Sequence, residues 1–149
     1  MACRVLDMIY LRKIREDASA AYSCGAYGGA SLADDGYKIY QMVGECPMKP
    51  EKKDIALKIM TEEANKLSTT CDAEMLAKVK AVMLKQADDR AKTNAFWSST
   101  IYDDYKLGID TYPNYKKLVE AQTPQNITAF MKEFLTHGNK VTVVMLPKM

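Results

Sequence analysis

The spacing of hydrophobic positions changes between the first and second parts of the N-terminal region. From Ala20 to Ala26, apolar residues alternate with smaller or polar ones, which is the two-residue period of a strand. Before that, the apolar residues recur at helical spacing: Val5, Leu6, Met8, Ile9, Leu11 and Ile14. The pattern therefore predicts a helix that ends near Arg15 and a strand that begins near Ala20.

A second strand is predicted over residues 37–45, which are aromatic and β-branched. The stretch 28–36 before it is rich in Gly and Asp, so we expect a short turn and an antiparallel hairpin. Gly28 and Gly29 are interpreted as turn residues. They do not form a phosphate loop, because no helix opens there and no Lys-Ser/Thr pair follows.

Helical spacing then returns in five further segments: 50–67, 72–90, a segment around 96–105, 112–120 and 124–137. Pro50 and Pro124 suit the first turn of their helices, and Thr123 supplies a capping hydroxyl. Residues 68–70, Ser-Thr-Thr, are expected to end one helix and offer capping oxygens to the next. Gly108 is expected to stop the fourth helix.

The chain closes with a β-branched run, 140–147, which predicts a third strand stopped by Pro147. The fold class is thus α+β, with an antiparallel-type sheet of about three strands covered by about six helices. So few strands would leave long unpaired edges, and we expect self-association through such an edge.

Composition narrows the class of function. Hydrophobic residues make up 48% and charged residues 27%, which is typical of a globular domain. The 21 basic and 19 acidic residues give a net charge of +2, which does not favour nucleic acid as a partner. No apolar run reaches the roughly 20 residues that a membrane span needs.

A zinc site cannot be assembled from the cysteines and histidine of this chain. The four cysteines, at positions 3, 24, 46 and 71, are widely spaced, and His137 is the single histidine. The cysteines are interpreted as small buried apolar residues, and a Cys24–Cys46 bridge between neighbouring strands is also compatible with the sequence. His137, next to Gly138, is interpreted as part of a helix C-terminus.

Arg15 and Tyr22 are the candidate site residues. A guanidinium fork and a phenol hydroxyl could converge on one oxygen, such as a carbonyl or a developing oxyanion. The alternative is structural: Arg15 complements the helix C-terminus, and Tyr22 is a half-buried strand aromatic.

Four local motifs, in this order, resemble the insulinase/pitrilysin-type zinc peptidases, the family that includes the mitochondrial processing peptidase. They are Ile14-Arg15-Glu16 with Ala20-Ala21-Tyr22-Ser23, then Glu45-Cys46-Pro47 leading to Pro50-Glu51, then Asp72-Ala73-Glu74-Met75-Leu76, and finally Thr123-Pro124 with the closing run 141–147. The resemblance covers essentially the whole chain, 1–149, as the later part of a C-terminal, non-zinc domain.

The resemblance implies a peptidase whose two halves close on a peptide like a clamshell. The first half carries zinc in an H-x-x-E-H motif, with the glutamate as general base. The second half supplies an arginine and a tyrosine seven residues apart, matched here by Arg15 and Tyr22, which bind substrate backbone oxygen and the tetrahedral intermediate. The implied partners are a peptide substrate and the zinc-bearing N-terminal half.

The sequence also departs from the family pattern. It has no H-x-x-E-H motif, and Ser19 stands where many members have glycine. The upstream part of the domain is expected to lie outside these residues. We therefore expect the substrate-binding C-terminal portion of a zinc metalloendopeptidase, inactive on its own and without a cofactor of its own. The alternative is a non-catalytic structural or interaction domain of the same fold.

Overall fold

The structure is a computed structural model that describes residues 1–32, 37–108 and 112–146. Its elements follow one another as α1 (Ala2–Tyr10), a π-helix η1 (Leu11–Asp17), β1 (Gly25–Leu32), β2 (Lys38–Glu45), a 3-10 helix η2 (Pro50–Lys52), α2 (Lys53–Leu67), α3 (Ala73–Arg90), α4 (Asn94–Leu107), α5 (Tyr115–Glu120) and α6 (Pro124–His137). The α+β class is confirmed.

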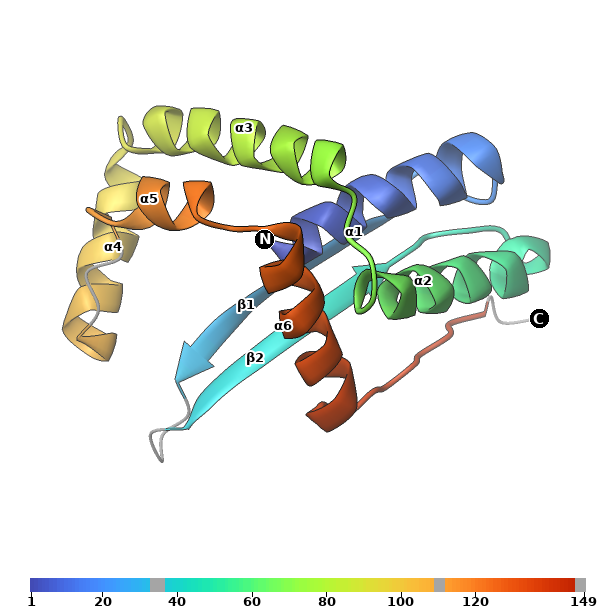
Figure 1. Cartoon of the computed structure of the whole chain (residues 1–149). Coiled ribbons are helices and arrows are strands. Elements are labelled where there is room, and N and C mark those ends of the chain that lie inside the picture. Colours follow the sequence, from blue (N-terminus) through green and yellow to red (C-terminus); the bar gives the residue numbers. More distant parts are fainter. Residues whose placement is uncertain (33–36, 109–111, 147–149) are drawn as a thin grey trace.

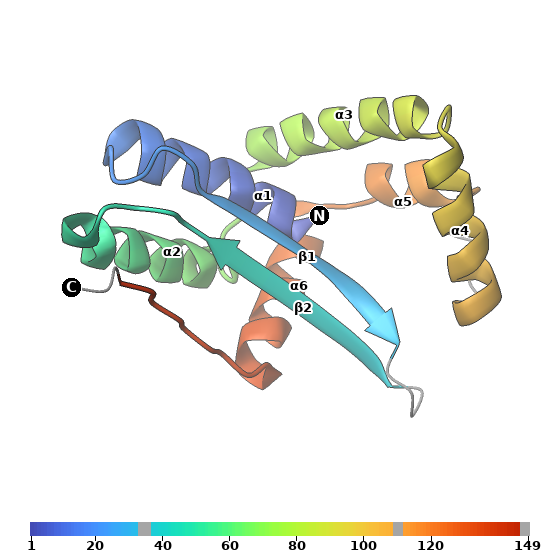
Figure 2. The same ribbon diagram turned by 180° about the vertical axis from the view of Figure 1, so that it is seen from behind.

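The two strands form an antiparallel hairpin, and helices α1, α2 and α6 cover one of its faces (Figure 1 and Figure 2). The largest fully buried side chains lie where these helices meet: Val5, Leu6, Ile14, Leu67 and Met131. Tyr10 at the end of α1 is also buried, and its hydroxyl donates to the Met60 carbonyl at 3.0 Å. The apolar spacing of the sequence therefore marks the faces that meet in the core.

The remaining helices, α3, α4 and α5, form a group at one end of the molecule (Figure 1). Helix α3 begins at Asp72, whose carboxylate accepts from the Met75 amide at 2.7 Å. The expectation that residues 68–70 cap this helix is wrong. The hydroxyls of Ser68 and Thr69 instead donate back to the carbonyls of Asn65 and Lys66 at the end of α2.

Strand β1 differs from its expected position. It begins at Gly25, not Ala20, and it runs through Gly28 and Gly29, which were expected in the turn. The reason is a close approach: a Cβ on Gly28 would lie 2.2 Å from the Gln41 carbonyl oxygen and 2.9 Å from Cys3 Sγ. Glycine is needed inside the strand at this point. The remainder of the expected turn, residues 33–36, lies outside the described residues.

The expected third strand is not confirmed. Residues 140–146 carry no strand, and the sheet of the described residues has the order β1-β2. The segment is extended in Figure 1, and Val141, Val143 and Met145 are largely exposed. β-Branched residues favour an extended backbone, but a strand also needs a neighbour whose amides and carbonyls complete the ladder. Pro147, the expected stop, lies outside the described residues.

Candidate functional site

Arg15 lies near the end of a π-helix that continues directly from α1. The helical backbone was expected to end near Arg15, but it extends to Asp17 with the wider π-type turn. Ile14, the residue before Arg15, is fully buried, so it anchors η1 in the core. Arg15 itself is exposed. π-Type turns are rare and often occur at functional sites.

A tight turn connects η1 to Tyr22. The Ala20 amide donates to the Ile14 carbonyl at 2.8 Å, and Ser19 has φ +46°, the left-handed region that glycine prefers. Ala20 and Ala21 are then buried, and Ala21 forms a bridge to Met48. Ser19 is thus the residue at which the chain turns back toward β1.

Tyr22 points outward from this anchored turn. Its side chain is 85% exposed, so the interpretation as a half-buried strand aromatic is wrong. The Cζ atom of Arg15 lies 5.2 Å from the centre of the Tyr22 ring, within the range of a cation–π contact. The structure therefore brings the two candidate residues together on the surface.

Helix η1 is tied to α2 by an ion pair. Lys13 Nζ lies 2.6 Å from Glu63 Oε1, and the Glu63 side chain is only 12% exposed. Glu63 is on α2, 50 positions from Lys13 in sequence. This contact and the buried Ile14 side chain hold the element that carries Arg15 in place.

No group of three or more His, Cys, Asp or Glu side chains in residues 1–32, 37–108 and 112–146 could hold a metal ion. These residues do not fit a zinc site, and we assign no metal-dependent step to them. His137 is at the exposed C-terminal end of α6, where Nδ1 lies 3.2 Å from the Glu133 carbonyl oxygen.

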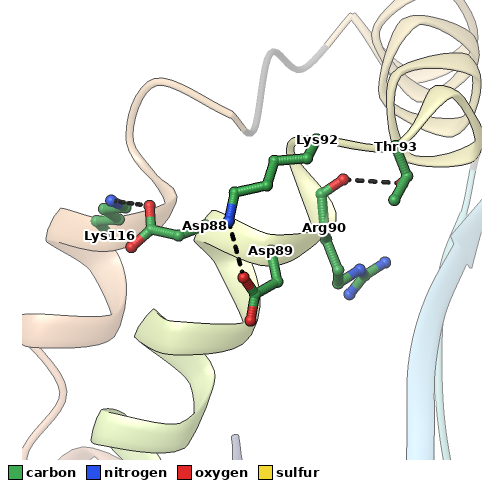
Figure 3. Close-up of polar contacts among 6 residues, drawn as sticks. All are labelled: Asp88, Asp89, Arg90, Lys92, Thr93 and Lys116. Carbon is green, nitrogen blue, oxygen red and sulfur yellow. Dashed lines mark hydrogen bonds and ion pairs between the residues drawn. The ribbon is translucent and has the colours of Figure 1, made fainter.

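A second site, which sequence reasoning missed, is a cleft of about 330 Å³ between α3, α4 and α5. Arg4, Arg90, Lys116 and Asp88 supply the charges of its lining, and Phe96 and Tyr112 are among its aromatic residues. Figure 3 shows the Asp88–Lys116 ion pair, at 2.5 Å, which joins α3 to α5. The hydrogen bond to Asp88 raises the pKa of Lys116.

Two aromatic residues of the cleft lining, Phe96 and Tyr112, pack against Trp97 behind them. The ring of Trp97 lies 4.7 Å from that of Tyr112 and 5.4 Å from that of Phe96, and Arg90 Cζ lies 5.7 Å from the Phe96 ring centre. The turn before α4 is fixed by Thr93, whose hydroxyl donates to the Arg90 carbonyl (Figure 3). The sequence signal was weak, because Arg90, Phe96 and Tyr112 come from α3, from α4 and from the turn before α5.

Comparisons with known proteins show a similarity in fold but no match in sequence. No protein-family model matches the sequence, and no curated protein matches it. The structure is similar to part of the periplasmic protease PqqL from Escherichia coli, with a TM-score of 0.65 and 20% sequence identity. The similarity covers 92% of this chain and 15% of that chain. The fold is therefore an α+β fold of a kind found within this protease.

The helices differ from membrane-spanning helices in length or in composition. Within the described part of the chain, none combines the length and the apolar character that crossing a bilayer requires.

Proposed function

We propose that this chain is the substrate-binding part of the C-terminal domain of an insulinase/pitrilysin-type zinc metalloendopeptidase. Its fold similarity to a protease supports the proposal at the level of the fold. The observation that carries the proposal further is the exposed Arg15–Tyr22 pair, with 5.2 Å between the guanidinium carbon and the ring centre. Both residues match the arginine and tyrosine of that family in type and spacing.

The proposed role of the pair is to bind a carbonyl oxygen of the peptide. Arg15 carries several N–H donors, and the Tyr22 hydroxyl carries one more. Stacking on the ring limits the directions in which the guanidinium can point, so its donors are partly preorganised. Donors that are already in place stabilise the charge that develops on an oxygen in the transition state. In this role the pair positions substrate and stabilises charge, and no proton transfer is assigned to it.

The zinc of the proposed enzyme belongs to the N-terminal half of the full-length protein. The 149-residue chain on its own is then expected to bind no stoichiometric zinc and to cleave no peptide. Metal analysis after washing with a chelator, together with a fluorogenic peptide assay, tests this. One tightly held zinc ion per chain would contradict it.

The residue roles are tested in the full-length protein by kinetics. Arg15→Ala and Tyr22→Phe should each lower kcat/KM on the order of 100-fold, as loss of one such donor typically does. Arg12→Ala on the same π-helix and Tyr27→Phe on β1 are matched controls, because both residues are also exposed. Measuring kcat and KM separately distinguishes ground-state binding from transition-state stabilisation. Unchanged kinetics in both test variants would reduce the pair to a structural contact.

A second candidate function is a non-catalytic interaction domain, and the cleft between α3, α4 and α5 favours it. The lining carries Arg4, Arg90 and Lys116 against Asp88, beside the rings of Phe96 and Tyr112. This chemistry suits an acidic peptide segment that also carries an apolar side chain.

Trp97, the single tryptophan of the chain, is a reporter for this cleft because its ring contacts both Phe96 and Tyr112. Titration with a short Asp/Phe peptide should change the Trp97 fluorescence to saturation, and Arg90→Glu should abolish the change. Lys92→Glu is the control, because Lys92 is exposed and does not line the cleft. No saturable change in the wild-type chain would contradict the interaction function.

A further inference from the structure

Cys24 and Cys46 adjoin the last pair of the hairpin ladder, and both thiols are free in the structure. The last pair of the ladder is Gly25 with Glu45; Cys24 comes directly before β1, and Cys46 comes directly after β2. Three positions beyond Cys24, Ala21 forms a bridge to Met48. The two chain segments are thus held together on both sides of the cysteine pair.

Both thiols are on the helix-covered face. Facing residues of an antiparallel pair share a face, and residues two positions along a strand return to it. Two positions from the cysteines is the pair Ala26–Gly44, and a Cβ on Gly44 would lie 2.7 Å from the Met60 side chain of α2. Cys24 and Cys46 are accordingly half-buried against the core.

The thiols also influence each other. Burial raises the pKa of both, and Cys24 raises the pKa of Cys46 further. If the pairing continues by one residue beyond the ladder, the Cα atoms of Cys24 and Cys46 come to about 4.5 or 5.5 Å from each other. Both separations fall within the roughly 4.4–6.8 Å that a disulfide spans.

We propose that Cys24 and Cys46 form a reversible disulfide that fastens the base of the hairpin. A low-molecular-weight disulfide such as oxidised glutathione serves as the oxidant. One protein thiolate attacks it and releases one reduced thiol, and the second cysteine then attacks the mixed disulfide and releases the other. The two protein thiols lose two electrons and two protons, and the small disulfide takes them up as two thiols.

The remaining cysteines belong to other places in the fold. Cys3 on α1 approaches Gly28, which is four residues from Cys24 along the strand, about 13 Å at the usual rise. Cys71 is buried just before α3. They therefore serve as internal controls.

The proposed bond would act on the turn that carries Tyr22. Tyr22 is two residues before Cys24, and the charge and backbone of Arg15 offset part of the rise that burial causes in the pKa of the Cys24 thiol. A covalent link to β2 at this point would limit opening of the segment between η1 and β1. The proposal itself stands on the strand geometry and does not depend on the peptidase function.

The test uses the full 149-residue chain in glutathione buffers of increasing oxidised fraction, followed by alkylation of free thiols and mass spectrometry. Trypsin cuts after Lys38, so Cys24 and Cys46 fall in different peptides. We expect two of the four thiols to become protected, with one linked peptide pair that contains Cys24 and Cys46. The disulfide would close the loop from Cys24 to Cys46, which should raise Tm by about 5 °C or more. Reduction should reverse this rise.

Variants make the test specific. Cys3→Ser and Cys71→Ser should keep the linked pair and the rise in Tm, whereas Cys24→Ser and Cys46→Ser should each lose both. The wild-type peptide map decides the matter even if a variant fails to fold. Four free thiols across the whole buffer range, glutathione adducts alone, or a linked pair that contains Cys3 or Cys71 would overturn the proposal.

Discussion

The Cζ atom of Arg15 lies 5.2 Å from the centre of the Tyr22 ring, and both side chains are exposed. The two residues belong to different elements, because Arg15 is on the π-helix η1 and Tyr22 is between the Ala21–Met48 bridge and β1. The turn between them, with Ser19 at positive φ, brings them together. The contact is thus a product of local backbone geometry and of the buried anchors on either side of it.

Ser19 is the first position at which this geometry can be tested. At φ +46° a serine is disfavoured, and glycine is not. Ser19→Gly should raise the free energy of unfolding by about 0.5–1 kcal/mol. Ser19→Val should lower it, because a β-branched residue fits this region poorly. Urea unfolding measures both changes.

Ser23→Gly is the matched control for Ser19, since Ser23 is also exposed and does not have positive φ. The control substitution should not stabilise the chain. Equal effects of glycine at the two positions would contradict the strain assigned to Ser19.

Gly28 and Gly29 form a matched pair inside β1. Gly28→Ala places a Cβ 2.2 Å from the Gln41 carbonyl oxygen, so the hairpin must shift, and we expect a loss of about 1–3 kcal/mol. A Cβ on Gly29 meets nothing within 4 Å, so Gly29→Ala should be neutral or slightly stabilising. Thermal or urea unfolding measures the stability of the two variants. An equal loss of stability in Gly29→Ala and Gly28→Ala would argue against the strand register.

The Lys13–Glu63 contact should couple η1 to α2. A double-mutant cycle with Lys13→Met and Glu63→Gln should give a coupling of about 1 kcal/mol, because Glu63 is largely buried. The Lys58–Glu62 pair is the control: its atoms are 3.8 Å apart and both side chains are exposed, so its coupling should be about 0.3 kcal/mol. Unfolding in urea gives both values, and equal coupling in the two pairs would contradict the anchoring role.

The raised pKa of Tyr10 predicts that the folded chain loses stability at alkaline pH. Burial, with smaller contributions from Glu63 and Cys3, raises the pKa of Tyr10 from 10.0 to about 12. The folded chain therefore holds this proton more tightly than the unfolded chain. The resulting stabilisation is complete below pH 10 and is lost as the pH rises toward 12.

This pH effect is measured by unfolding at several alkaline pH values, with Tyr10→Phe as the comparison. The variant should lose less stability than the wild type between pH 10 and 12. The ultraviolet absorbance of tyrosinate should show one tyrosine that ionises later than the others. The same pH dependence in both proteins would contradict the assignment.

The sequence predicted the helices because apolar residues recur along them at helical spacing, and in α1, α2, α3 and α6 these residues contribute to the core. Pro50, Pro124 and Gly108 also acted as expected, since proline at a first turn and glycine at a helix end satisfy local backbone needs. Gly28 was misinterpreted because a glycine in a turn and a glycine under a crossing helix look the same in sequence. Its contact with Cys3 exists only after folding.

The candidate site was predicted only in part. Residue types and spacing pointed to Arg15 and Tyr22, and the structure places them in contact. The π-helix was not predictable, because the same apolar spacing suits an α-helix. The run 140–146 was expected to be a strand on β propensity, which cannot supply a pairing partner.

In the proposed function, Arg15 and Tyr22 bind the same oxygen in the transition state. The most direct test is a double-mutant cycle on kcat/KM in the full-length protein, with Arg15→Ala, Tyr22→Phe and the double variant. Residues that act as a unit are strongly non-additive, so we predict a loss on the order of 100-fold for each single variant and little further loss in the double variant. Single variants with wild-type kcat/KM, or losses that multiply fully in the double variant, would contradict the claim.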